Sequence, residues 1–229
     1  MIKNMKCAPI SDLFYHLSRR VIQAILLFCL ISTKAVAGNE PIRIIIFGDS
    51  LTAGPGVAAQ DTLPAQLERR LIQHGYLVVV INAGVSGDTT EMGLARVAYT
   101  LEDVPFQIGI IELGANDMLR GLDPKRAQAN LEQLISAFQA KGVRVLVATM
   151  VSSENWGQTY KANFDSIYPQ LSRKYGVPLI PFMMEGVWGD PRQLIGDGLH
   201  PNAAGIAKMV DHMLPEVEKM LSSMASEKK

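Results

Sequence analysis

The chain has 229 residues, of which 48% are hydrophobic and 19% are charged, a composition that suits one globular domain with a core of its own. The net charge is zero, but residues 1–37 hold five of the 22 basic residues and one of the 22 acidic residues. The rest of the chain therefore has 17 basic and 21 acidic side chains and a net charge of −4. A mildly acidic body without a run of lysine and arginine is a poor partner for a phosphate backbone, which argues against nucleic-acid binding.

The first 37 residues have the features of a secretory signal peptide. A basic stretch ends at Arg20, an apolar run of 11 residues follows over 21–31, and the small residues Ala35 and Ala37 come after it. This order predicts export, with cleavage after Ala37 and a single mature domain over 38–229 that is periplasmic or secreted. The apolar run is shorter than the roughly 20 residues that cross a bilayer as a helix, so an uncleaved membrane anchor is the weaker alternative.

Both cysteines of the chain, Cys7 and Cys29, lie in this predicted leader. The mature protein would then have no thiol, which excludes disulfides, cysteine catalysis and thiolate metal sites. The bulky Phe28 before Cys29 argues against lipoprotein processing. We therefore expect no stable membrane anchor after cleavage.

Beyond the predicted leader, short β-rich runs alternate with amphipathic stretches. The isoleucine-rich run 42–47 is typical of a buried parallel strand, and Asp123 followed by Pro124 predicts a helix start. In chain order we expect strand 42–47, helix 62–74, strand 77–81, helix 91–101, strand 108–113, helix 123–140, strand 143–149, helix 158–175, strand 177–181 and helix 202–222, with Pro215 kinking or interrupting the last. The alternation predicts a three-layer α/β/α sandwich with a five-stranded, mostly parallel sheet.

In open sheets of this kind, ligands bind at the carboxyl ends of the strands, so the loops that follow the strands are where a site is expected. The longest of these loops cover 48–57, 82–90, 114–122 and 182–200. The first contains a serine and the last a histidine, two residue types that can act together in acyl transfer.

Only one of the four histidines, His200, lies on a predicted loop. It stands in the pentapeptide 197–201, where Asp197 precedes it by three residues and Gly198 permits a tight turn. The carboxylate could accept a hydrogen bond from the imidazole Nδ1 and leave Nε2 basic, as a catalytic triad requires. Alternatively, the pentapeptide is a helix N-terminal turn in which Asp197 bonds only to backbone amides, and the pentapeptide alone does not decide between the two.

A candidate nucleophile, Ser50, directly follows the first strand in the tetrapeptide Gly-Asp-Ser-Leu over 48–51. There the hydroxyl would point out of a rigid element, and the Ser50 N–H could face a developing oxyanion. The alternative is that Ser50 merely caps a turn. No Gly-x-Ser-x-Gly elbow occurs, which argues against the usual α/β-hydrolase arrangement. We expect Asp49 to be structural, because adjacent residues at a strand end point to opposite sides.

Two further residues are candidates for an oxyanion hole. Gly84, after the second strand, could present a bare backbone amide, and Asn116, after the third strand, offers a side-chain NH₂ donor. Each such donor typically stabilises a transition state by about 2.7–4 kcal/mol. Taken singly, Gly84 could equally be an ordinary turn glycine, and Asn116 an Asx-turn residue.

Together these residues make the chain resemble the SGNH/GDSL hydrolase family, whose four sequence blocks supply a serine, a glycine, an asparagine and an Asp-x-x-His pair. In family order, the blocks fall on Ser50, Gly84, Asn116, Asp197 and His200. The stretches 112–117, 119–121, 177–179 and 197–202 also resemble the branch of bacterial periplasmic acyl-CoA thioesterases, lysophospholipases and arylesterases. The resemblance covers about residues 42–214. Ala115 and Met118 depart from it, because glycines often stand there.

The resemblance implies a flavodoxin-like fold and a serine hydrolase of acyl esters and thioesters that needs no metal and no cofactor. It assigns the triad to Ser50, His200 and Asp197, and the oxyanion hole to the Ser50 and Gly84 amides with Asn116. Its partner would be a small-molecule acyl ester or thioester, and we expect a monomer. Activity should decline as the pH falls through about 6–7, where histidine side chains become charged.

An apolar wall for an acyl chain could be formed by Met118, Leu119 and Trp156, with help from Met183 and Met184. The alternative for the two adjacent methionines is that they fill gaps in the core. Two other functions remain open at this stage. One is a carbohydrate O-acetyl esterase on the same fold, and the other is a non-enzymatic periplasmic binding protein.

Overall fold

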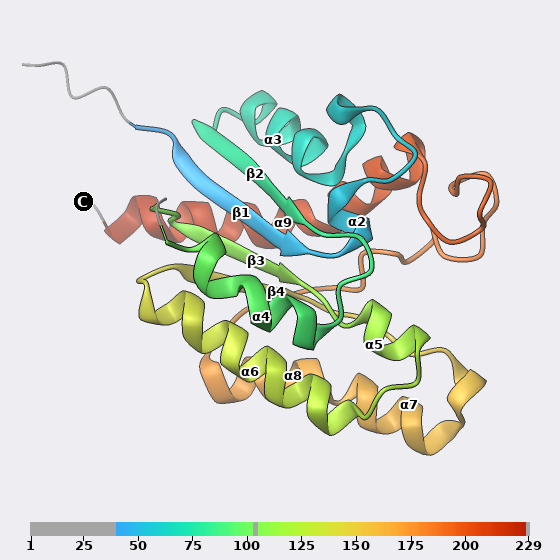
Figure 1. The fold of residues 1–229 in the computed structure, drawn as a ribbon. Coiled ribbons are helices and arrows are strands. Elements are labelled where there is room, and N and C mark those ends of the chain that lie inside the picture. The colour runs from blue at the N-terminus through green and yellow to red at the C-terminus, as the bar shows by residue number, and fades with distance from the viewer. Residues whose placement is uncertain (1–39, 103–104, 228–229) are drawn as a thin grey trace, which may run out of the picture. The chain divides into compact units, whose positions relative to one another are not determined.

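A computed structural model describes residues 40–102 and 105–227 (Figure 1). The predicted leader over 1–37, its cleavage point and both cysteines lie outside the described residues, so those expectations stay predictions. Contacts within the chain group everything from Pro41 onward into one unit. Within the described ranges, no helix combines the length and the apolar character needed to cross a bilayer.

Five parallel strands form one sheet in the order β2-β1-β3-β4-β5, as expected for a flavodoxin-like sandwich. Their bounds are β1 Ile42–Gly48, β2 Val78–Gly84, β3 Ile108–Glu112, β4 Arg144–Ala148 and β5 Leu179–Ile180. The central strand β1 pairs with β2 and β3, and its residues 44–47 are buried. A strand covered on both faces explains why this run is apolar throughout rather than alternating.

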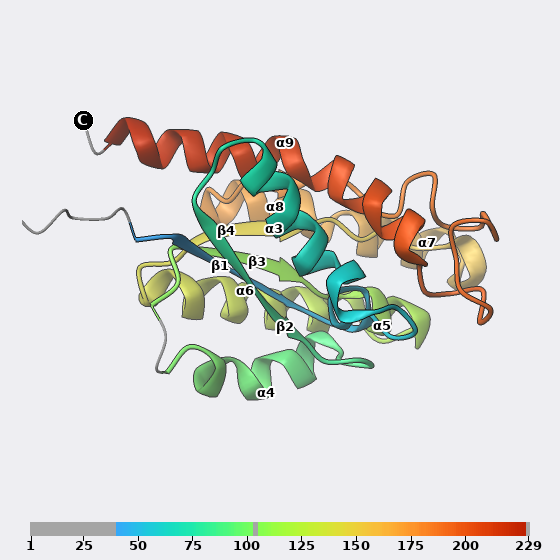
Figure 2. The same ribbon diagram turned by 90° about the horizontal axis from the view of Figure 1, so that it is seen from above.

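Helices cover both faces of the sheet (Figure 2). Their bounds are α2 Ser50–Ala53, α3 Leu63–Gln73, α4 Thr90–Thr100, α5 Ala115–Leu119, α6 Pro124–Ala140, α7 Gln158–Asp165, α8 Ile167–Tyr175 and α9 Ala203–Glu227, with short 3₁₀ turns η1 Ala59–Asp61 and η2 Glu154–Trp156. Helices α3 and α9 pack together on one face, whereas α4, α6 and α8 lie on the other. The predicted three-layer architecture is confirmed.

Local sequence signals account for the longer helices. In α3, Leu63, Leu67 and Leu71 recur every fourth residue and are all buried, so one stripe of the helix faces the sheet. Helix α6 begins where predicted, because Asp123 Oδ1 accepts a hydrogen bond from Lys125 N at 3.0 Å and caps the first turn.

The structure corrects the bounds of one predicted helix and shows that Pro215 does not interrupt another. The helix predicted over 158–175 is divided into α7 and α8 at Ser166. Pro169 has no N–H for the carbonyl of Asp165, and its ring crowds that carbonyl, which explains a break at this point. Conversely, α9 runs unbroken through Pro215. Buried side chains on both sides of Pro215, among them Met213 and Val217, hold the two halves against the core.

Candidate active site

The candidate nucleophile Ser50 is the first residue of α2 and comes directly after β1. The turn between the two elements is held by Asp49, whose Oδ1 accepts a hydrogen bond from Leu51 N at 3.0 Å. Ser50 is half-buried and lies at the carboxyl edge of the sheet. The short helix was not expected, because four residues are too few to show a helical period.

The structure brings together three of the predicted residues. The His200 Nε2 atom lies 2.9 Å from Ser50 Oγ, across 150 positions of sequence, and His200 Nδ1 lies 2.6 Å from Asp197 Oδ2. Both distances are within hydrogen-bonding range. A hydroxyl, an imidazole and a carboxylate in this order form the geometry of a catalytic triad.

Asp197 does both things that its pentapeptide allows. Its Oδ1 accepts hydrogen bonds from Leu199 N and His200 N at 2.9 and 3.0 Å, while Oδ2 faces the imidazole. Gly198 has a φ of 69°, which permits this turn. The hydrogen bonds from the His200 side chain and the two amides lower the pKa of Asp197 to about 2. The carboxylate is therefore charged at any pH at which an esterase would work.

Asp49 is buried and does not bond to the imidazole. Besides capping α2, it accepts a hydrogen bond on Oδ2 from Asn116 Nδ2 at 3.0 Å. Burial, opposed by these hydrogen bonds, raises the pKa of Asp49 to about 6. The geometry agrees with the structural role expected for this residue.

A second buried carboxyl group, Glu112 at the end of β3, lies directly behind the nucleophile turn. Its Oε2 accepts hydrogen bonds from Asp49 N at 3.2 Å and Thr52 Oγ1 at 2.6 Å, while its Oε1 is buried without a partner. Complete burial and the nearby charge of Asp49 raise the pKa of Glu112 well above its usual range. Glu112 begins the stretch 112–117 that carries part of the family resemblance, but its role behind the nucleophile turn was not predicted, because a glutamate at a strand end resembles any other polar residue.

Asn116 lies in the first turn of α5 and lines the same groove as Ser50 and His200. Its Nδ2 donates to Asp49 Oδ2 and to the Asp88 backbone oxygen, each at 3.0 Å. Both amide hydrogens are therefore engaged in this state, although the side chain is well placed beside the nucleophile.

Gly84 is the last residue of β2, not a turn residue, and it pairs in register with Gly48. Its N–H donates to Asn82 Oδ1 at 3.0 Å. A Cβ at Gly84 would lie 2.3 Å from Ala53 N, so the close packing of α2 on β2 already requires glycine here. The loop beyond β2 reaches the catalytic groove through Ser86 and Gly87 instead.

Arg96 on α4 ties the strand ends together beneath the site, a role that sequence reasoning missed. Its Nη2 donates to the backbone oxygens of Gly48 and Ala83 at 3.0 Å, and its Nε pairs with Asp88 Oδ2 at 2.6 Å. Because the Asp88 backbone oxygen also holds Asn116, Arg96 links β1, β2 and the asparagine into one network.

Two adjoining hollows lie at the nucleophile. The catalytic groove has a volume of about 380 Å³ and contains Ser50, Asn116 and His200. The apolar cavity beside it has a volume of about 210 Å³, and its wall includes Met150, Phe182 and Met184. The two share Leu51, Ala115 and Trp188 as a common wall.

The predicted substrate-binding residues are distributed unevenly. Met118 lines the apolar cavity, and Leu119 lines the catalytic groove. Trp156 lines neither, since its indole N–H donates to the Met118 backbone oxygen at 2.8 Å and its ring covers Gly121. Trp188, which walls both hollows, was missed, although it lies in the long segment that precedes His200.

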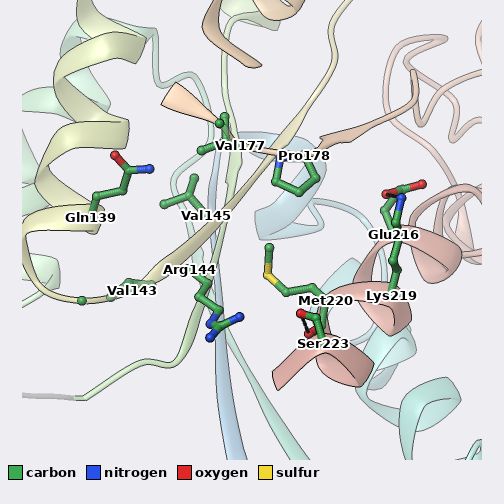
Figure 3. Close-up of a pocket in the computed structure, with 12 residues that line it drawn as sticks. Gln139, Val143, Arg144, Val145, Val177, Pro178, Glu216, Lys219, Met220 and Ser223 are labelled. Atoms are coloured by element: carbon green, nitrogen blue, oxygen red, sulfur yellow. Dashed lines mark hydrogen bonds and ion pairs between the residues drawn. The ribbon is translucent and has the colours of Figure 1, made fainter. Parts of the chain in front are cut away.

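A larger hollow of about 530 Å³ lies at the opposite edge of the sheet, at the amino ends of β4 and β5 (Figure 3). It is lined by Arg144, Val177, Met220 and neighbouring residues, and by none of the predicted site residues. Arg144 pairs there with Glu227 near the end of α9. Because ligands of open sheets bind at the carboxyl ends, this hollow is not the expected place for catalysis.

The model of the GDSL-like lipase/acylhydrolase family matches residues 46–208, which include Ser50, Asp197 and His200. The chain belongs to this family. It is thereby a hydrolase of the ester- and thioester-cleaving class. Within the described residues, no cluster of three or more His, Cys, Asp or Glu side chains is arranged to hold a metal ion.

Relatives with described activities match nearly the whole chain. An arylesterase of Vibrio mimicus is 36% identical over 88% of this chain and 99% of its own length. A thioesterase 1/protease 1/lysophospholipase L1 of Escherichia coli strain K12 is 32% identical over 86% of this chain and 92% of its own. Among solved structures, the SGNH-hydrolase family esterase AlinE4 is 41% identical, with a TM-score of 0.67, over 80% of this chain and 97% of its own.

Proposed function

We propose that this GDSL-family hydrolase cleaves acyl esters and thioesters through a covalent acyl-enzyme on Ser50. The observation that carries the proposal is the hydrogen-bonded series Ser50 Oγ, His200 Nε2, His200 Nδ1 and Asp197 Oδ2, with distances of 2.9 and 2.6 Å. Asp197 orients the imidazole and keeps its proton on Nδ1, so that Nε2 is free to act as a base.

The reaction proceeds in two halves. His200 takes the proton of the Ser50 hydroxyl as the oxygen attacks the substrate carbonyl, and a tetrahedral oxyanion forms. His200 then passes this proton to the departing alcohol or thiol, which leaves the acyl group on Ser50. Water, activated by the same imidazole, attacks the acyl-enzyme and releases the carboxylic acid. No metal or cofactor takes part in this scheme.

The oxyanion donors we propose are the Ser50 N–H, the Gly84 N–H and the Asn116 amide. The Ser50 N–H belongs to the first turn of α2, where backbone amides have no partner inside the helix. Asn116 and Gly84 are bonded to protein oxygens in this state. Each of them therefore has to share or exchange a hydrogen bond when the tetrahedral intermediate forms.

The substrate class follows from the cavity beside the nucleophile. A hollow of about 210 Å³ with methionine and aromatic walls suits an aliphatic acyl chain better than an acetyl group on a sugar. The names of the relatives, arylesterase and thioesterase/lysophospholipase, agree with acyl substrates that carry varied leaving groups. We propose medium-chain acyl esters and thioesters, with Met118 and Leu119 contacting the substrate.

We also infer that the hydrolase is exported and acts in the periplasm or outside the cell as a monomer. The basic, apolar and small-residue order of the first 37 residues supports this inference. The intact mass of the protein recovered from the cell envelope would test cleavage after Ala37. Recovery of the full-length chain in the membrane fraction would favour an uncleaved anchor instead.

The test of activity is hydrolysis of p-nitrophenyl esters from acetate to palmitate by the protein and by its Ser50→Ala variant. We expect activity that peaks at medium acyl chains and disappears in the variant, together with fluorophosphonate labelling of the wild-type protein alone. Activity confined to acetate would indicate the sugar-deacetylase alternative. A protein that hydrolyses no ester and takes no label would be a binding protein.

A further inference from the structure

The exposed large apolar side chains are gathered unevenly on this molecule. Among residues 40–102 and 105–227 ten are exposed, and six of them lie on the loops, short helices and helix starts that follow the carboxyl ends of the strands. We call these six the apolar rim: Val85, Met92, Leu119, Leu122, Trp156 and Trp188. Soluble monomers rarely group such side chains without a function, so the rim indicates a surface that binds a partner.

The apolar rim adjoins the two hollows of the site. Leu119 and Trp188 line the catalytic groove, and Trp188 also lines the apolar cavity. Val85 precedes Ser86, which lines the groove as well. Trp156 is bonded to the backbone of Met118, whose side chain lines the cavity. A partner that covers the rim would therefore cover the entrance to the site.

The two tryptophans are held at the surface with their rings half exposed. Trp156 is fixed by its hydrogen bond to the Met118 backbone oxygen and by the Tyr160 ring, whose centroid lies 6.3 Å away. The backbone of Trp188 is held in a turn, because its N–H donates to the Met184 backbone oxygen at 2.8 Å. Indole rings prefer the boundary between water and lipid, where their apolar body and polar N–H are both accommodated. This preference favours a lipid surface as the partner.

Charged side chains of both signs lie near the rim in the sequence, among them Arg120, Lys125, Asp123 and Glu154, and two pairs of opposite sign are in contact. Arg126 pairs with Glu91 at 2.5 Å, and Arg192 pairs with Asp190 at 2.9 Å. The chain beyond the predicted leader also has a net charge of −4, which opposes binding to an anionic membrane. A zwitterionic lipid surface fits this charge distribution, because the rim could bind such a surface by apolar contact alone, without electrostatic attraction.

We propose that the apolar rim docks on the surface of a zwitterionic phospholipid aggregate. An acyl chain would then pass from the lipid into the cavity without crossing water. This inference rests on the proposed function, since it supplies the same site with substrate. It adds a surface that would make the hydrolase prefer aggregated lipid to dissolved ester.

The chain is suited to a direct test because Trp156 and Trp188 are its only tryptophans, and both belong to the rim. The experiment titrates the exported form of the Ser50→Ala variant, which cannot turn substrate over, with phosphatidylcholine vesicles and lysophosphatidylcholine micelles. Docking predicts a blue shift of the tryptophan emission and quenching by lipids brominated near the headgroup. A spectrum unchanged at saturating lipid would overturn the proposal.

Matched variants distinguish lipid binding by the apolar rim from nonspecific adsorption of the protein to lipid. Val85→Ser with Leu122→Ser removes two exposed rim side chains that line neither hollow and leaves both tryptophans in place. We expect lipid binding to weaken by about tenfold or more. The control is Tyr99→Ser, because Tyr99 is 84% exposed but lies in the last turn of α4, away from the rim. Equal weakening by both variants would contradict the proposal.

Two further outcomes bear on it. Binding that requires anionic lipid and disappears in salt would overturn the proposal, since it would show an electrostatic partner. Hydrolysis of dissolved p-nitrophenyl butyrate by the wild-type protein tests the proposed function separately. If dissolved ester is cleaved but no lipid is bound, the function stands and the docking surface is wrong.

Discussion

Asp49 bonds directly to Asn116, with 3.0 Å between its Oδ2 and the asparagine Nδ2. The carboxylate beside the nucleophile therefore does not orient the histidine but positions the side chain proposed to stabilise the oxyanion. Its other oxygen caps α2 through Leu51 N, so one group fixes two parts of the site.

The first prediction concerns Asp49→Asn. An amide at this position can still cap Leu51 through its oxygen, but its NH₂ group would face the NH₂ group of Asn116. Asn116 has to turn away, and we expect kcat to fall by about 10²-fold with little change in KM. If Asp49 acts through Asn116, Asp49→Asn has little further effect in an Asn116→Ala background. Fully additive losses in the double variant would contradict this.

The second prediction is the shape of the acid limb of the pH profile. As the pH falls through about 6, Asp49 gains a proton and ceases to be an anionic acceptor for Asn116. Protonation of the imidazole Nε2 also removes the base, so log kcat should fall more steeply than one proton allows when both groups are protonated. The Asp49→Asn variant should show the one-proton slope. A flat profile from about pH 5 to 9 would count against His200 as the base.

The third prediction concerns Glu112, whose raised pKa means that the folded state keeps a proton that the unfolded chain releases. The contribution of Glu112 to stability is then greatest below the ordinary glutamate pKa and falls as the pH rises above it. Glu112→Gln stays neutral and can still accept hydrogen bonds from Asp49 N and Thr52, so its stability relative to wild type should increase with pH. Urea unfolding at pH 4 and pH 7 measures this.

Glu112→Ala is the contrasting variant. It leaves the Asp49 N–H and the Thr52 hydroxyl without their acceptor and opens a cavity behind the nucleophile turn. We expect it to lose about 2–4 kcal/mol of unfolding free energy and much of its activity. Equal behaviour of the Gln and Ala variants would show that the hydrogen bonds to Glu112 do not support the turn.

Much of the fold could be predicted, because the central strands β1, β3 and β4 are buried and appear in the sequence as apolar runs. The position of the site followed from the same pattern, since Ser50, Asn116 and His200 all come after strand ends. Short elements were not accessible in this way. Helices α2 and α5 have four and five residues, fewer than a periodic signal requires.

Other details depend on contacts between residues far apart in sequence. The bond from Asn116 to Asp49 spans 67 positions, and the burial of Glu112 depends on strands that pair around it. Gly84 is a further example of such a contact. The backbone of Ala53 approaches it closely, which explains why this position needs glycine. Periodicity and motifs locate such residues but do not reveal which neighbour imposes the constraint.

The fourth prediction distinguishes the role of Asp197, which contacts the imidazole, from that of Asp49, which does not. Asp197→Asn keeps the shape of the side chain but can present an NH₂ group to His200 Nδ1, which favours the wrong tautomer. We expect kcat to fall by about 10²–10⁴-fold while the fold is unchanged. Because the pKa of Asp197 is about 2, this carboxylate does not titrate near neutral pH. The loss of wild-type activity at acid pH must therefore come from the protonation of other groups. A variant with near wild-type kcat would show that Asp197 is not part of a catalytic triad.

The last prediction tests the apolar cavity through Ala115, a small residue in the wall that the cavity shares with the catalytic groove. Ala115→Leu would extend a larger side chain into the passage between them. Long chains need that passage and acetyl groups do not, so we expect kcat/KM to fall by about tenfold or more for octanoate esters and little for acetate. Ala129→Leu, on the exposed face of α6, is the control for an added leucine. A uniform loss across all chain lengths would mean that Ala115 supports the fold of α5 rather than selecting the acyl chain.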